Sequence, residues 1–428
     1  MQHFSGALLI AALAFVPGLP AQSSSKDKIK NIDALAKQGD PAIEQLRGYF
    51  QDSDPKVRRE AVDAIATIGG AKSLDPLVEA AKEQDAEVRQ LAVDGLVNFY
   101  YPGYRQTGIS GSLKRLGRGI KGRFTDTNDQ VIHPAIEVRA DVREAIATAV
   151  GLGVNYETRA VAARGAGVLR VKEAKTALTD SLKTKDTTLI YESLVALQKI
   201  RDPETAPAVE FLLQDLNERV QIAALETVGL LRNRSASPGI RAAITRARNG
   251  KVRAAAVGAL AMLGDESNRS VFDTYYSDPD DNLRAAAAEG YARIGNHADL
   301  EKVERNFESE TKMKPRLSLA FAAVSLGRTN MAKFSPLEYL VNTLNNSGYR
   351  SVAAAFLREL SYRSDVRESL YPGMESRTKA EKQDLAEALA YTGDAKSVPV
   401  LEALTKDPDG EVSQAASRAL ASVRARVR

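Results

Sequence analysis

Apolar residues recur at intervals of three and four along short stretches of this chain, and each stretch begins just after a small polar residue. In the first clear example, Asp54 precedes Val57, Ala61 and Ile65. Side chains with this spacing share one face of an α-helix. An Asp in front of them accepts hydrogen bonds from the unpaired N–H groups of the first helical turn. The pattern therefore predicts a series of capped amphipathic helices.

These stretches return with a nearly constant period, and a second amphipathic stretch precedes each one. Aligned on the residue after the first apolar position, nine of the ten intervals are 31 to 34 residues, and the tenth is 70. The eleven aligned residues are Arg58, Arg89, Arg159, Ile190, Gln221, Arg253, Arg284, Arg316, Arg350, Lys382 and Ser413. A fixed period of this size is typical of a solenoid of stacked helical hairpins.

Residues at both ends of the predicted second helices support this interpretation. Four positions before the aligned residue, nine copies carry Asp or Asn: Asp54, Asp85, Asn155, Asp186, Asn217, Asn249, Asp280, Asn346 and Asp409. Thr378 takes the same place in a tenth copy, and Lys312 is the exception. At the other end, left-handed C-caps are predicted at Gly69, Gly264, Gly295, Gly327 and Gly393.

The recurring phrase Asp-x-x-Val-Arg-x-x-Ala-x-x-x-Leu resembles the HEAT-like repeat of the phycobilisome-lyase type, over roughly residues 40–425. The resemblance implies an all-α fold, a right-handed α-solenoid (superhelix) of about eleven HEAT-like hairpins, used for protein–protein interaction. The whole chain also resembles secreted bacterial HEAT-repeat proteins. The repeat type by itself suggests a second function, that of a bilin lyase or a chaperone of bilin proteins.

The first residues of the chain have a different character. A short apolar run, Leu8 to Val16, is followed by Pro17, Gly18 and small residues up to Ala21. This order predicts a signal peptide over residues 1–21 and a periplasmic or secreted protein, although the n-region carries little positive charge. A disordered or membrane-tethering N-terminus is the alternative. The apolar run is too short for a transmembrane helix, so none is expected in the mature chain.

The long interval between Arg89 and Arg159 indicates an insertion. We expect N-terminal helical repeats over 26–97, a Gly-rich basic insertion over 98–136, and the rest of the solenoid over 137–428. The insertion has six Lys and Arg against two Asp, a net +4 that equals the net charge of the whole chain. This small total gives no indication of nucleic-acid binding.

The insertion is the best candidate for a binding site, because insertions in a repeat gather on one face of a solenoid. Its Tyr, Arg and Gly residues suit an anionic partner: lipid headgroups, acidic glycans or an acidic protein surface. The candidate partner-binding residues are Tyr100, Tyr101, Tyr104, Arg105, Lys114, Arg115, Arg118, Lys121, Arg123 and Phe124. Two alternatives stay open, a solvated excursion that binds nothing and a short helix that packs on the solenoid with Leu113, Leu116 and Ile120.

Residues for catalysis or metal binding are scarce. Cysteine is absent, and of the three His only His133 and His297 lie outside the predicted signal peptide, far apart in sequence. No His-Glu pair, nucleotide-binding loop or plausible triad is present, so no metal, cofactor or enzyme activity is expected. The recurring Arg of the aligned position is interpreted as structural, bridging to a capping Asp, in preference to a row that grips an anionic partner.

These features favour a non-enzymatic interaction scaffold or adaptor outside the cytoplasm. Its protein partner would bind along the solenoid groove, with the basic loop as an accessory contact. The alternatives are a bilin lyase or chaperone-like protein, and a module that binds anionic lipid or glycan surfaces through residues 99–124.

Overall fold

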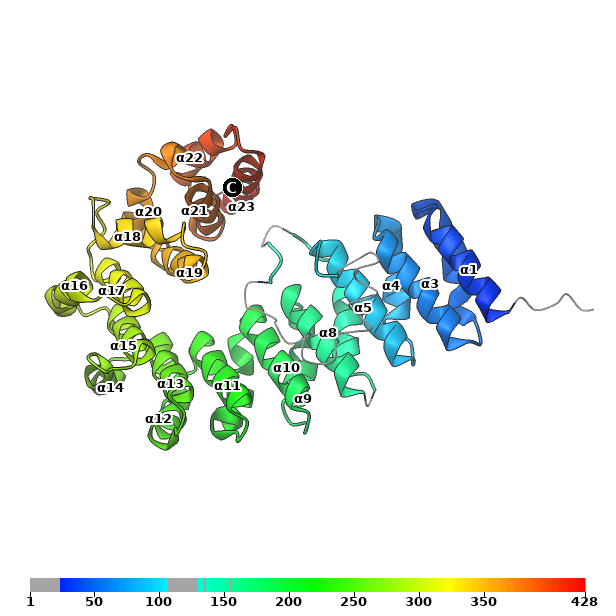
Figure 1. Cartoon of the computed structure of the whole chain (residues 1–428), viewed down its shortest axis with the longest axis horizontal. Helices are drawn as coiled ribbons and strands as arrows, with labels where there is room; N and C mark the ends of the chain where they lie inside the picture. Colours follow the sequence, from blue (N-terminus) through cyan, green and yellow to red (C-terminus); the bar gives the residue numbers. More distant parts are fainter. Residues whose placement is uncertain (1–23, 106–129, 134–135, 154, 428) are drawn as a thin grey trace, which may run out of the picture.

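The structure is a computed structural model that describes residues 24–105, 130–133, 136–153 and 155–427. Within these ranges the chain is helical and contains no strand, so the predicted all-α solenoid is confirmed. After α1 (Ser25–Ala36), the helices pair into eleven hairpins that follow one another along a curve (Figure 1). The predicted signal peptide lies outside the described residues.

The eleven aligned residues all lie on the second helices of the hairpins. These are α3 (Pro55–Ile68), α5 (Ala86–Tyr100), α8 (Tyr156–Val168), α10 (Thr187–Ile200), α11 (Glu218–Leu230), α13 (Gly250–Leu263), α15 (Asp281–Ile294), α17 (Met313–Ser325), α19 (Arg350–Leu360), α21 (Lys379–Thr392) and α23 (Gly410–Val427). Helix α5 continues to Tyr100, so it extends slightly into the predicted insertion.

The first helices of the hairpins are shorter. They are α2 (Ile43–Arg47), α4 (Leu74–Ala80), α7 (Ala140–Gly151), α9 (Lys175–Ser181), η6 (Pro203–Gln214), α12 (Ser237–Arg246), α14 (Arg269–Tyr275), α16 (Leu300–Ser309), α18 (Pro336–Thr343), α20 (Ser364–Ser369) and α22 (Ser397–Leu404). Segment η6 is a 3₁₀ helix with Pro207 inside it, a residue that cannot donate an α-helical hydrogen bond.

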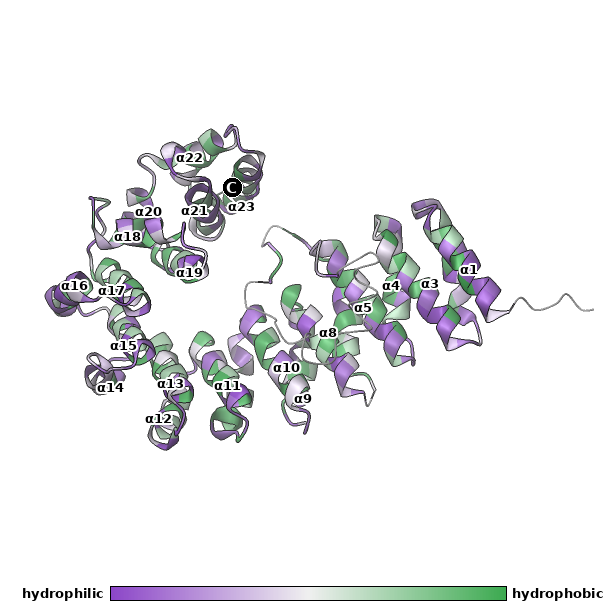
Figure 2. Cartoon of the chain, in the orientation of Figure 1, coloured by the Kyte–Doolittle hydropathy of each residue, from purple (hydrophilic) through white to green (hydrophobic). Residues whose placement is uncertain are grey.

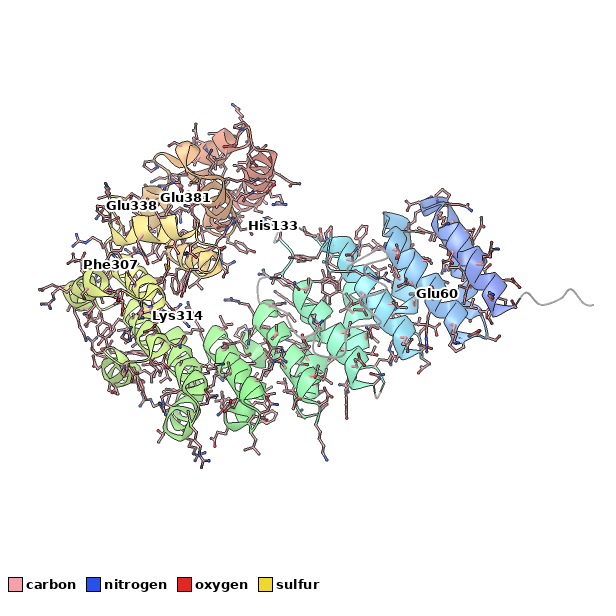
Figure 3. The ribbon with its side chains drawn as sticks, viewed as in Figure 1. Glu60, His133, Phe307, Lys314, Glu338 and Glu381 are labelled. Atoms are coloured by element: carbon pink, nitrogen blue, oxygen red, sulfur yellow. The ribbon has the colours of Figure 1, made fainter. Side chains whose placement is uncertain are left out.

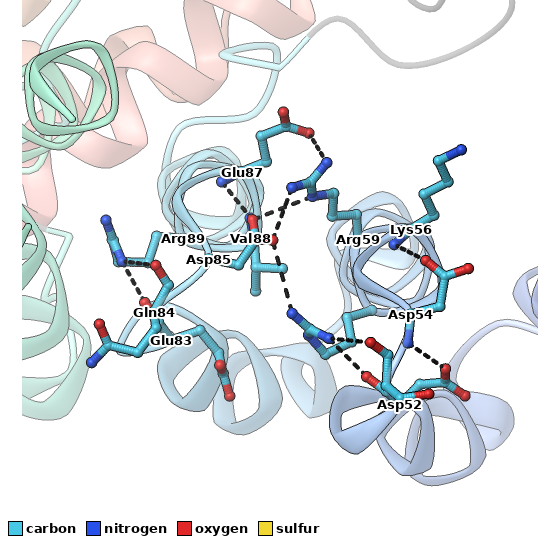
Figure 4. Close-up of polar contacts among 12 residues, drawn as sticks. Asp52, Asp54, Lys56, Arg59, Glu83, Gln84, Asp85, Glu87, Val88 and Arg89 are labelled. Atoms are coloured by element: carbon cyan, nitrogen blue, oxygen red, sulfur yellow. Dashed lines mark hydrogen bonds and ion pairs between the residues drawn. The ribbon is translucent and has the colours of Figure 1, made fainter.

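Polar caps begin most second helices as the sequence predicts. Asp85 accepts hydrogen bonds from the N–H groups of Glu87 and Val88, at 2.9 and 3.1 Å (Figure 4). Equivalent caps are formed by Asp54, Asn155, Asp186, Asn217, Asn249, Asp280, Thr378 and Asp409. The prediction is wrong at Asn346, whose side chain accepts from Gly348 N–H in a turn before α19.

The C-terminal ends of the second helices hold an unexpected feature. Gly69, Gly264, Gly295 and Gly327 have positive φ as predicted, whereas Gly393 has φ −63° and the prediction there is wrong. Three further helix ends place arginine in the left-handed conformation: Arg170, Arg201 and Arg232, with φ of 51°, 60° and 53°. This conformation costs a residue with a Cβ about 1 kcal/mol or more.

The recurring arginines at the aligned position stabilise the hairpins, as predicted. Arg58 lies 3.9 Å from the capping Asp85 of the next hairpin, as predicted, but the contact that recurs has a different acceptor. Arg89 donates to the carbonyl groups of Glu83 and Gln84, at 2.6 and 2.9 Å, just after the first helix of its own hairpin (Figure 4). Arg58, Arg253 and Arg284 make the same contact six residues back. Each guanidinium therefore satisfies carbonyl oxygens that the end of a helix leaves unpaired.

Buried apolar side chains form one continuous core along the described hairpins, and the hydrophobic faces of neighbouring helices pack together (Figure 2). The first helices α12, α14 and α16 lie on the outer side of the curve, with α13, α15 and α17 inside (Figure 1). The C-terminal hairpins turn back toward the middle of the chain. None of the described helices has both the length and the apolar character needed to cross a bilayer.

Candidate binding surface

The side chains that the second helices turn away from the core form one strip, which we call the inner face. Its members stand one, five and nine residues after the aligned position, a spacing that keeps them on one side of a helix. On α11 they are Ile222, Glu226 and Leu230, all half-buried. The partial burial of Glu226 raises the pKa of its carboxyl.

Contacts between distant hairpins show that the inner face is concave. Arg293 on α15 makes a bidentate ion pair with Glu359 on α19, with both N···O distances at 2.9 Å. A third carboxylate oxygen, from Glu289, lies 2.9 Å from the same guanidinium. All three residues occupy inner-face positions, so the inner surfaces of α15 and α19 meet.

A longer-range contact joins the two arms of the solenoid, by which we mean the hairpins up to α11 and the C-terminal hairpins from α18 onward. His133 belongs to the C-terminal part of the predicted insertion (Figure 3). Its Nε2 lies 3.6 Å from Glu387 on α21. Burial and Arg418 lower the pKa of His133, while Glu387 raises it, and the net direction is downward. The neighbouring Ile132 donates its N–H to the carbonyl of Val168 at 2.9 Å, which fixes the segment at the end of α8.

The described part of the insertion docks on the solenoid. The Tyr100 side chain is buried, and its hydroxyl accepts a hydrogen bond from the Arg139 N–H at 3.2 Å. Tyr101 and Tyr104 are half-buried against the core. Arg105 forms an ion pair with Asp63 on the inner face of α3. These contacts hold the start of the insertion against the solenoid and engage Arg105 within the chain.

The remaining candidates of the insertion, Lys114, Arg115, Arg118, Lys121, Arg123 and Phe124, lie outside the described residues, as does the alternative helix at Leu113, Leu116 and Ile120. Their role in binding stays a prediction. His297, the other isolated histidine, contacts the carbonyl of Leu326 through Nδ1 at 2.7 Å. Among the described residues no three His, Asp or Glu side chains are grouped so that they could hold a metal ion.

Sequence reasoning missed the inner-face contacts and the left-handed arginines. The contact of His133 with Glu387 joins residues on different hairpins and has no local sequence signature. The arginines did have a signal, because Arg170, Arg201 and Arg232 stand eleven residues after their aligned positions. Glycine occupies that place in five other repeats: Gly69, Gly264, Gly295, Gly327 and Gly393.

Known structures with a similar arrangement share little sequence with this chain. An engineered protein is 19% identical, with 89% of this chain and 98% of that one covered and a TM-score of 0.34. YibA of Escherichia coli is 13% identical, with 73% and 100% covered and a TM-score of 0.41. The CpcE–CpcF complex of phycocyanin lyase from Nostoc sp. is 16% identical, with 74% and 100% covered and a TM-score of 0.30.

No curated protein matches the sequence with significance. The family profile of HEAT repeats matches residues 14–97, 153–229, 208–292 and 237–323, which together span more than half of the chain. The matched regions include α3, most of α5 and the run of second helices from α8 to most of α17, whose inner face is described above. The chain belongs to the HEAT repeat family.

Proposed function

We propose that the protein is a non-enzymatic scaffold outside the cytoplasm, which holds a protein partner on its inner face. The observation that carries this proposal is the concave inner face, where side chains from hairpins far apart in sequence converge. A partner on this surface contacts several hairpins at once, which is how solenoid proteins use their curvature. The family supports the same general role, since HEAT repeats commonly mediate protein binding.

The location and the accessory contact rest on sequence. The predicted signal peptide over residues 1–21 supports export, and the basic insertion supports an additional contact to an anionic part of the partner. The insertion starts beside the inner face, because Arg105 pairs with Asp63 there. A partner held on the inner face therefore lies within reach of the first residues of the loop.

Affinity capture from a periplasmic extract tests the proposal with a matched pair of substitutions. Ile222 on the inner face and Val271 on the outer helix α14 are both half-buried residues that pack against the core. We expect wild type and Val271→Glu to retain the same protein, and Ile222→Glu to lose it. A form lacking residues 106–129 should retain it more weakly. Equal retention by both Glu variants, or no protein above background with wild type, would contradict the proposal.

A further inference from the structure

A group of arginines on the concave side of the solenoid has no acidic partner. Three are Arg170, Arg201 and Arg232, the residues with positive φ at the ends of α8, α10 and α11. The fourth, Arg358, belongs to α19 on the opposite arm and stacks on the ring of Tyr391 at 5.0 Å from its centre. We call these four residues the arginine row.

The arginine row contrasts with the arginines of the inner face, which are paired within the chain. Arg293 binds Glu289 and Glu359, and Arg164 binds Glu192 at 2.7 Å. Among the described residues no carboxylate forms an ion pair with a guanidinium of the arginine row. The Nε atom of Arg170 is buried and has no hydrogen-bond acceptor within that part of the chain.

Three arginines of the row, Arg170, Arg201 and Arg358, also lie close enough to act on one another. Burial lowers the pKa of Arg201, and the positive charges of Arg358 and Arg170 lower it further. Glu359, which is paired with Arg293, raises it but does not reverse the direction. The side chain of Arg201 is exposed to solvent, so it stands in a space that protein surrounds and water enters. Like charges gathered in such a space repel one another unless an anion binds between them.

The backbone conformation shows that the arginines occupy unfavourable positions. Glycine stands at the equivalent place after α3, α13, α15 and α17 and adopts positive φ without strain. Three consecutive hairpins have arginine there and keep the left-handed conformation. The left-handed residue closes each helix end with backbone hydrogen bonds, which glycine would allow without strain. Strained residues are concentrated at binding sites. Strain and unpaired charge thus indicate the same three hairpins.

We infer that the arginine row binds an extended acidic segment of the protein partner, with an acidic residue at about every third position. Neighbouring packed helices are separated by about 8–10 Å. A polyproline II segment advances about 9 Å in three residues and returns its side chains to the same side. Carboxylates three residues apart therefore meet the guanidinium groups of successive hairpins, each of which can bind a carboxylate through two N–H groups.

The surroundings favour a short acidic peptide over a long polyanion. A carboxylate of the inner face flanks the arginine row, since Glu387 on α21 and Arg170 both act on Tyr391. This carboxylate repels a phosphate or sulfate backbone that continues past the row. Exposed Tyr362, which lies near Arg201, offers an aromatic surface for the uncharged residues of a peptide.

Fluorescence anisotropy with synthetic peptides tests the inference on the full-length protein. The probe is labelled (Pro-Pro-Glu)₄, and (Pro-Pro-Gln)₄ is the neutral control. We expect only the acidic peptide to bind, and its affinity to fall as salt is raised. The double substitution Arg201→Gly and Arg232→Gly should lower the affinity about tenfold or more, since each removes a charge-assisted contact. Arg305→Ala, on the outer helix α16, should leave it unchanged.

Melting curves distinguish loss of the binding site from loss of the folded structure. Because glycine accepts the left-handed conformation, the double variant should melt no lower than wild type while it loses the peptide. Equal affinity of the double variant and wild type, or no binding of (Pro-Pro-Glu)₄ by wild type at low salt, overturns the inference. Tighter binding of heparin or an oligonucleotide at the same arginines overturns the choice of a peptide. The inference rests on the proposed scaffold function, but its failure leaves the Ile222 capture result standing.

Discussion

Replacing Asp85 tests whether the capping residues and the links between hairpins have the energies that their geometry implies. The Asp85 carboxylate caps α5 through two N–H groups and accepts hydrogen bonds from Nε and Nη2 of Arg59 on α3, at 3.2 and 2.9 Å (Figure 4). Its side chain is only 11% exposed. Loss of an N-cap costs about 1 kcal/mol, and the half-buried link to Arg59 contributes about 1 kcal/mol more. Asp85→Ala should therefore destabilise this region by about 2 kcal/mol.

Hydrogen exchange followed by mass spectrometry measures the effect locally, because the hairpins of a solenoid can open separately. Protection of residues 86–100 should fall about thirty-fold in Asp85→Ala, since 1.36 kcal/mol is a factor of ten. Asp85→Asn keeps a capping oxygen but loses the charge, and its loss should be about five-fold. The C-terminal helices α21 and α23 serve as an internal control. Unchanged protection in α5, or equal losses in both variants, would refute this reasoning.

The pH dependence of the same carboxylate provides a check with a defined sign. Burial by itself would raise the pKa of Asp85, but hydrogen bonds from Arg59 and from the first turn of α5 outweigh it, so the pKa is lowered. The folded state then binds fewer protons than the unfolded state. Its stabilising contribution is present above the unfolded value of 3.8 and is lost as the pH falls below it. Asp85→Ala should remove this part of the acid sensitivity.

Three further substitutions or conditions test other parts of the structure. Gly290→Ala should lower stability by about 2 kcal/mol, measured by urea denaturation, because its Cβ would lie 2.5 Å from the buried ring of Phe272. Arg293→Ala should cost about 3 kcal/mol in the same assay, since it leaves two carboxylates unpaired, whereas Arg305→Ala on the surface should cost less than about 0.5 kcal/mol. The pKa of His133 is lowered where it contacts the other arm, so protonation below the ordinary value of 6.5 should favour separation of the two arms. The separation would be measured as a longer distance between spin labels on α5 and α21, and a constant distance from pH 7 to pH 5 would contradict it.

The fold was largely predictable because its determinants are local and repeated. Each hairpin carries its own apolar stripe, nearly all carry a polar cap residue and five a terminal glycine, so the copies support the same prediction. The exceptions have local causes as well. Asn346 is followed by Ser-Gly-Tyr before α19 begins, so its side chain closes a turn that delays the helix start. The backbone carbonyl groups that accept hydrogen bonds from the recurring arginines were not predicted, because every residue has a carbonyl group and the sequence does not mark these.

The binding surface was predictable only in part. The sequence indicates a solenoid but not how strongly it curves, because curvature depends on small rotations that accumulate from hairpin to hairpin. The meeting of Arg293 with Glu359, and of His133 with Glu387, depends on that accumulated curvature. The charge of the basic insertion predicted partner-binding residues there, yet Tyr100 and Arg105 make contacts within the chain. The arginine row could not be identified from the sequence, because only the positive φ of Arg201 distinguishes it from other exposed arginines.

Site-specific photo-crosslinking in living cells tests most directly whether the inner face holds the partner. A benzophenone side chain would replace either Met262, half-buried on the inner face of α13, or Thr274, exposed on the outer helix α14. We predict a discrete protein adduct from position 262 and none from position 274. An adduct from position 274 alone, equal adducts from both, or none from either would contradict the account.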